Sequence, residues 1–164
     1  MLTVGHNVLS TSDLEPYSGW ESFRPRIEDA SNVYNELASP EAISRVGLRY
    51  INRIHQAAVE TNFSDYFRVE APSPPGMEVS IRSFLTRSEA RLPSGDILVL
   101  TFASSRLENG EDAFVLDLDV SREFESEPLV SLMRIVDELR TQEREAFENC
   151  ITDRARELFD GIHN

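Results

Sequence analysis

The clearest pattern of apolar and polar positions lies in residues 43–55, where the two kinds of side chain alternate. A period of two residues is typical of a strand with one face in the core. The segment therefore predicts a strand with an apolar face (Val46, Leu48, Tyr50 and Ile54) and an arginine face (Arg45, Arg49 and Arg53).

Three further strands are predicted later in the chain, at residues 77–90, 97–105 and 113–120. A turn at residues 93–96 separates the first two, and Asn109-Gly110, a dipeptide typical of hairpins, separates the last two. In residues 113–120, Asp117 and Asp119 alternate with large apolar side chains, so both carboxylates should lie on one face.

Helical spacing appears in two long segments. Ser18 and Glu21 fit a capping box, and the apolar side chains from Trp20 to Leu37 follow at steps of three and four until Ser39-Pro40. A second helix is expected to start near Ser126 and Pro128 and to break around residues 149–152. A short strand at residues 2–9 and a helical turn near residues 62–67 complete the pattern.

These elements predict one α+β domain over residues 1–164, in the order β-α-β-(α)-β-β-β-α. We expect a two-layer fold in which helices cover one face of an antiparallel sheet, by analogy a helix-grip or TATA-binding-protein-like half-domain. The covered face should carry Leu48, Tyr50, Leu98, Leu100, Phe102, Leu116 and Leu118, and the opposite face Arg45, Arg49, Arg53, Thr101, Asp117 and Asp119.

Composition limits the partners and the cellular location that we expect for this protein. The net charge is −13, and the 16 basic residues are all arginine. Such acidity disfavours binding to nucleic acid or to an anionic membrane, because both need a positive field. The single cysteine, Cys150, excludes an intramolecular disulfide, and we find no signal peptide and no apolar run of membrane-spanning length. These features predict a cytoplasmic protein.

Two features could carry chemistry. Asp117 and Asp119 could hold a divalent ion or act in acid–base catalysis, although a nuclease would want a third ligand or a lysine. The arginine row could bind an anion or a carboxylate, since a guanidinium grips an oxyanion at two points. Alternatively, if the two strands are neighbours, Arg49 and Arg53 can pair with Asp117 and Asp119 across the sheet.

Other motifs are missing from the sequence. The three histidines are scattered, no phosphate-binding glycine loop is present, and Cys150 lies on an apolar helix stripe. We therefore expect no metal, no cofactor and no catalytic residue. The candidate ligand- or partner-binding residues are Arg45, Arg49, Arg53, Asp117 and Asp119.

Several segments resemble a sporadically distributed family of uncharacterised bacterial proteins known by a TIGR family model. Residues 14–23, 65–67, 116–120 and 147–159 share its pattern, and the strand from Arg45 to Ile54 (RVGLRYINRI) is the most specific part. The family implies no activity. It does imply that longer members have a preceding strand-helix-strand region, so that this chain begins inside the pattern and lacks the N-terminal half.

Together these observations favour a non-enzymatic binding or assembly module that forms a homodimer or pairs with another protein. One alternative is a small acidic inhibitor or immunity-type protein that engages a basic toxin or nuclease. Another is a hydrolase or nuclease that uses Asp117 and Asp119.

Overall fold

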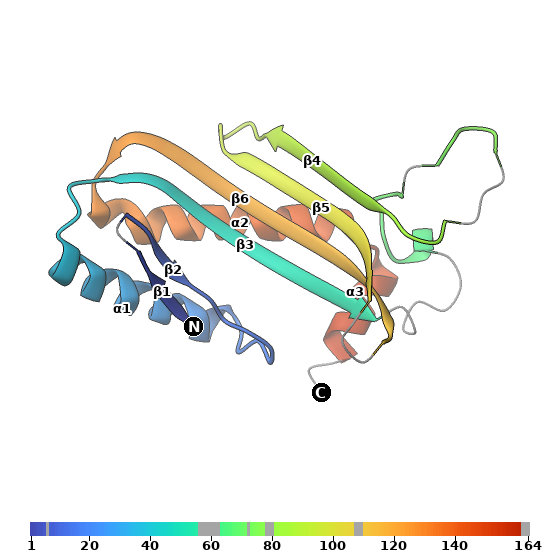
Figure 1. Ribbon diagram of the computed structural model, residues 1–164, viewed down its shortest axis with the longest axis horizontal. Coiled ribbons are helices and arrows are strands. Elements are labelled where there is room, and N and C mark those ends of the chain that lie inside the picture. The colour runs from blue at the N-terminus through green and yellow to red at the C-terminus, as the bar shows by residue number, and fades with distance from the viewer. Residues whose placement is uncertain (6, 56–62, 72, 78–80, 107–109, 162–164) are drawn as a thin grey trace. The chain divides into compact units, whose positions relative to one another are not determined.

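The computed structural model describes all residues except 6, 56–62, 72, 78–80, 107–109 and 162–164 (Figure 1). The chain divides into two compact units. Residues 1–44 and 125–133 form the first, which we call the N-terminal unit. Residues 45–124 and 134–164 form the second, which we call the sheet unit. A single domain over residues 1–164 stays a prediction.

The N-terminal unit begins with a hairpin of two short strands, β1 (Leu2–Val4) and β2 (Leu9–Thr11). One continuous strand over residues 2–9 was therefore the wrong prediction. The chain turns after β1, and the Gly5 N–H donates a hydrogen bond to the Val8 carbonyl oxygen at 2.8 Å. Glycine and asparagine in this stretch favour such a turn over a continued strand.

Helix α1 (Trp20–Ala38) follows in the same unit, and its start differs from the predicted capping box. Gly19, with a φ of 88°, precedes the helix and provides no side-chain cap. The Ser18 hydroxyl instead donates to the Asp13 carboxylate at 2.6 Å, and the Arg26 guanidinium donates to the same carboxylate at 2.7 Å. These bonds, led by that from Ser18, lower the pKa of Asp13 to about 2.

The sheet unit is built on a four-stranded antiparallel sheet in the order β3-β6-β5-β4 (Figure 1). Strand β3 (Ile43–His55) has the predicted bounds. Strands β5 (Ile97–Arg106) and β6 (Asp112–Glu127) form the predicted hairpin, with Leu100 opposite Leu118 and Thr101 opposite Asp117. Strand β4 (Leu85–Arg91) pairs with β5 and starts later than predicted, while β6 is longer and includes Ser126.

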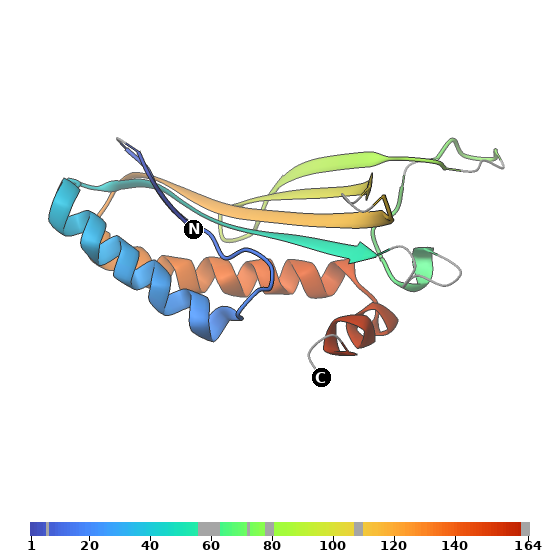
Figure 2. The same ribbon diagram turned by 60° about the horizontal axis from the view of Figure 1, so that its bottom comes forward.

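Helix α2 (Leu132–Cys150) follows the short 3₁₀ helix η3 (Leu129–Ser131) and lies along one face of the sheet (Figure 2). Phe102, Leu116, Leu118, Ile135 and Leu139 are fully buried between them. The alternation in β3 predicted the sides correctly, since Val46, Leu48 and Ile54 are buried and Arg45, Arg49 and Arg53 are exposed. The α+β class and the helix-covered face of the sheet are confirmed.

The predicted break near residues 149–152 separates α2 from α3 (Asp153–Gly161). At the break Ile151 forms a β-bridge with Phe67, and the Thr152 N–H donates to the Tyr66 carbonyl oxygen at 3.0 Å. These bonds dock the segment after the 3₁₀ helix η2 (Phe63–Asp65) against the end of α2. None of the described helices combines the length and the apolar run that crossing a membrane requires.

Candidate functional site

The candidate residues lie on the face of the sheet opposite α2, which we call the open face. Within the sheet unit, no described helix or strand lies over it (Figure 2). Its side chains alternate with the core residues of the same strands, as the pleat requires. The open face comprises Arg45, Arg49, Ile51 and Arg53 of β3, Val115, Asp117, Asp119, Ser121 and Glu123 of β6, Ile97, Val99, Thr101 and Ala103 of β5, and Leu85, Arg87, Glu89 and Arg91 of β4.

Arg49 and Asp117 form the best-defined contact on this face. The Arg49 Nε donates to Asp117 Oδ1 at 2.8 Å and its Nη2 donates to Oδ2 at 2.6 Å. These hydrogen bonds raise the pKa of the Arg49 guanidinium above its ordinary value. Two parallel hydrogen bonds between fork and carboxylate are the strongest geometry for such a pair.

The second carboxylate pairs with an arginine other than the one predicted. Asp119 Oδ1 lies 4.0 Å from the Arg45 guanidinium, whereas we expected Asp119 to be reached from Arg49 or Arg53. Strands β3 and β6 run antiparallel, so a step forward from Asp117 to Asp119 is a step back from Arg49 towards Arg45. Cross-strand pairing is confirmed, but the pairs use Arg45 and Arg49 instead of Arg49 and Arg53.

Arg53 is thus separated from the other four candidate residues. It is exposed and forms no ion pair with any residue that the structure describes. Its neighbour His55 approaches the Glu111 carboxylate, with 3.2 Å between Nδ1 and Oε2. The end of β3 therefore carries a guanidinium that a partner can reach.

Cross-strand rows extend the pattern over the whole face. Thr101 lies between Asp117 of β6 and Arg87 of β4, and Val99 lies between Asp119 and Glu89. Next to these rows, Ala103 lies between Val115 and Leu85. Leu85 and Ile51 are 70% and 52% exposed, which places apolar surface beside the charged rows.

The open face differs in charge from the chain as a whole. The chain has a net charge of −13. On the open face, the arginines Arg45, Arg49, Arg53, Arg87 and Arg91 are nearly balanced by the carboxylates Glu89, Asp117, Asp119 and Glu123. This face is therefore locally close to neutral, with both signs and apolar side chains interspersed.

The catalytic role of Asp117 stays a prediction. Both of its oxygens accept hydrogen bonds from one guanidinium. Among the described residues, no group of three or more His, Cys, Asp or Glu side chains could hold a metal ion. In this structure Asp117 is the ion-pair partner of Arg49.

A second cluster, which the sequence analysis missed, lies at the β4–β5 turn. Asp96 is 1% exposed, and its carboxylate accepts hydrogen bonds from Arg122 at 2.6 and 2.8 Å. Gln142 donates to it at 2.6 Å and Ser94 at 2.9 Å. Arg122 also donates to Glu138 at 2.6 Å, so the cluster joins the turn, β6 and α2.

These bonds, led by that from Arg122, lower the pKa of Asp96 to about 2, and the bonds to Asp96 raise the pKa of Arg122 above its ordinary value. One signal was visible in the sequence: Glu138 and Gln142 are four residues apart, and so lie on one helix face. Nothing in the spacing links them to Asp96 or Arg122.

Glu143 is a second buried carboxylate, on the inward side of α2, and is 2% exposed. Burial raises its pKa, and the Arg140 guanidinium, one turn earlier, partly offsets this effect. Arg140 pairs with Glu143 and lies over the Tyr50 ring, with its Cζ 4.6 Å from the ring centroid. Arg140, Glu143 and Tyr50 together hold α2 against β3. None of the three lines either of the pockets found among the described residues.

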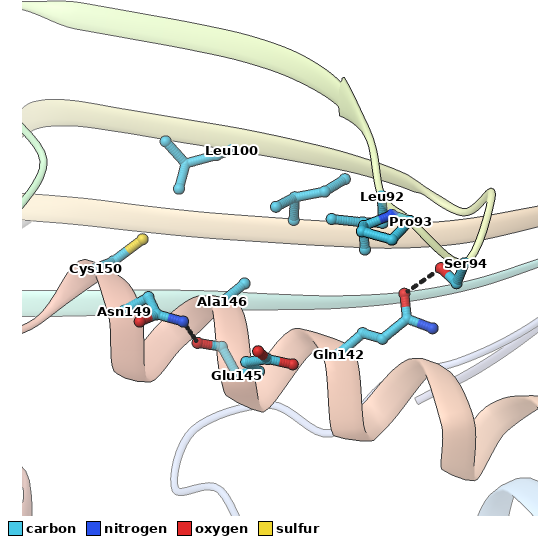
Figure 3. A pocket seen from close by; sticks show the side chains of 10 residues that line it. Leu92, Pro93, Ser94, Leu100, Gln142, Glu145, Ala146, Asn149 and Cys150 are labelled. Atoms are coloured by element: carbon cyan, nitrogen blue, oxygen red, sulfur yellow. Dashed lines mark hydrogen bonds between the residues drawn. The ribbon is translucent and has the colours of Figure 1, made fainter.

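A pocket of about 520 Å³ opens between α2 and β5, on the helix side of the sheet (Figure 3). Leu98 and Leu100 of β5 line it from the sheet, and Ala146 and Cys150 line it from α2. Burial raises the pKa of the Cys150 thiol to about 11, which keeps it protonated and unreactive. The remaining lining residues are Leu92, Pro93, Ser94, Gln142, Glu145 and Asn149.

The fold and the site define an α+β protein with a mixed-charge open sheet face. A scan against protein-family models, a search of curated proteins and a search of solved structures each gave no match to this chain. The resemblance to the TIGR-model family stays a prediction.

Proposed function

We propose that the chain is a non-enzymatic assembly module that forms a homodimer through its open face. The observation that carries the proposal is the interspersed pattern on that face: paired charges of both signs beside the exposed Ile51 and Leu85. A two-fold interface places each residue of one copy opposite a different residue of the other. A face with both signs can therefore complement itself.

The charge balance favours a second copy. Two surfaces that shared the overall charge of −13 would repel each other, but the open face carries a small excess of arginine. Arg53 has an exposed guanidinium available for a carboxylate of the other copy. Ile51 and Leu85 provide the apolar surface that an interface core requires.

The size of the face is also adequate. Strand rise and strand spacing give the four strands a projected area of about 600 Å². A standard interface buries roughly 800 Å² on each partner, so the open face falls near the lower end of the stable class. Both sheet edges, β3 and β4, remain unpaired among the described residues and offer another route to association.

Analytical ultracentrifugation from micromolar to near-millimolar protein tests the proposal. We expect a reversible dimer, and we expect Ile51→Glu to shift the monomer–dimer equilibrium towards monomer by at least tenfold. Met77→Glu is the control, because Met77 is also exposed in the sheet unit but lies in the loop before β4. A monomer at every concentration contradicts the proposal. Equal dimerisation of both variants would show that the dimer interface is not the open face.

A further inference from the structure

The pocket on the helix side of the sheet exists because one helix is narrower than four strands. Helix α2 buries Leu116 and Leu118 of β6 completely, but leaves Leu98 and Leu100 of β5 only half-buried. The β4–β5 turn, with Leu92 and Pro93, closes the end of the gap (Figure 3). The result is a cavity with an apolar floor rather than a flat surface.

The dimensions suit a small molecule. Pockets for drug-sized ligands typically have volumes of roughly 300–1,000 Å³, and this one has about 520 Å³. A side chain from a folded partner would fill only part of it. The half-buried leucines lose further contact with water when an apolar or aromatic body lies against them.

The polar side of the lining is rich in acceptors. Ser94 and Gln142 are already bonded to each other and to Asp96. The Asn149 amide donates to the Glu145 carbonyl oxygen at 2.9 Å, which leaves the Asn149 side-chain oxygen as an acceptor. The Glu145 carboxylate has no ion pair or hydrogen bond with a described residue, and no lining residue is positively charged.

We propose that this pocket binds a small amphipathic cation, with an apolar or aromatic body against Leu98 and Leu100 and a protonated amine at Glu145. The cation supplies the charge that the lining lacks, and the acceptor of Asn149 lies one turn further along the helix. The site lies on the other side of the sheet from the open face, so it is independent of the proposed dimer.

Fluorescence titration with a matched pair of probes tests the proposal. Dansylcadaverine has an aromatic body with an ammonium tail, and dansyl-aminohexanoate has the same body with a carboxylate tail. We expect the ammonium probe to bind and the carboxylate probe to bind at least tenfold more weakly. We expect Glu145→Gln to weaken the ammonium probe about fivefold, the size of a partly screened charge pair.

Two controls separate this site from general attraction to an acidic protein. Glu157→Gln removes one exposed carboxylate of α3 outside the lining and should leave binding unchanged. Ala146→Phe should fill the cavity and abolish binding of the ammonium probe. If Ala146→Phe does not fold, Ala146→Leu is the substitute and should weaken binding. Equal affinity for the two probes, equal effects of the two glutamine variants, or unchanged binding by Ala146→Phe overturns the proposal.

Discussion

Two arginine–aspartate pairs of the sheet unit share one geometry and differ in their surroundings. In each, a guanidinium donates two hydrogen bonds to a carboxylate, Arg49 to Asp117 and Arg122 to Asp96. The side chain of Arg49 is 57% exposed, and that of Arg122 is 22% exposed. Asp117 has no further described hydrogen-bond partner, whereas Asp96 is also held by Gln142 and Ser94.

The difference shows how the same contact serves different purposes. Breaking a buried pair leaves an uncompensated charge away from water and costs several kcal/mol, whereas water can solvate the remainder of an exposed pair. The Asp96 cluster therefore fastens the β4–β5 turn to α2. The pair at Asp117 contributes less to folding and stays available to exchange partners at an interface.

The largest expected effect is on the buried pair. Asp96→Ala should lower the free energy of unfolding by about 3 kcal/mol, because Arg122 loses its main partner in a largely buried position. Urea denaturation followed by circular dichroism measures the change. Asp96→Asn keeps the shape and provides a folded comparison if the alanine variant unfolds. A loss below about 1 kcal/mol would show that this cluster is no more than a surface pair.

Acidic pH should reduce the difference in free energy of unfolding between wild type and Asp96→Asn. The hydrogen bonds from Arg122, Gln142 and Ser94 lower the pKa of Asp96 to about 2. In the unfolded chain an aspartate has a pKa of about 3.9. A lowered pKa stabilises the fold above the unfolded value, and this contribution is lost as pH falls from about 4 to about 2.

We therefore expect the stability difference between wild type and Asp96→Asn to shrink over this pH window. Asp13 and Glu138 also have lowered pKa values. Asp13 lies in the N-terminal unit and should titrate alike in both proteins, so its contribution cancels in the difference. Glu138 shares Arg122 with Asp96. Comparing Asp96→Asn with the double variant Asp96→Asn/Glu138→Gln isolates the contribution of Glu138. A difference that stays constant from pH 6 to pH 2 would contradict the assignment.

Local patterns in the sequence predicted much of the fold. The alternation around Leu48 and Arg49 gave the bounds of β3 and both of its faces, since a period of two leaves only one assignment of sides. The break after Cys150 followed from the end of an apolar stripe. Ser18 does not cap the helix because Gly19 occupies the N-cap position, one residue later than predicted.

The site was harder to predict because its contacts are distant in sequence. Arg49 and Asp117 are 68 positions apart, and the register between β3 and β6 decides whether Asp119 meets Arg45 or Arg53. The Asp96 cluster joins three elements, and no periodicity connects them. The pocket arises from the width of the sheet relative to α2, which no segment encodes alone.

The smallest expected effect is on the exposed pair, Arg49 and Asp117. A double-mutant cycle with Arg49→Ala and Asp117→Ala should give a coupling energy of about 1 kcal/mol or less in the free energy of unfolding. The same cycle on Arg122 and Asp96 should give a coupling several times larger. The two pairs have similar hydrogen-bond distances, so burial would be the cause of the difference.

A coupling energy above about 2 kcal/mol between Arg49 and Asp117 would show that this pair stabilises the fold, as the buried pair does. The open face would then be rigid through its own ion pairs, and its charges could not re-pair with a second copy at small cost. A small coupling, together with loss of the dimer in Ile51→Glu, would instead assign the charged rows to recognition rather than to folding.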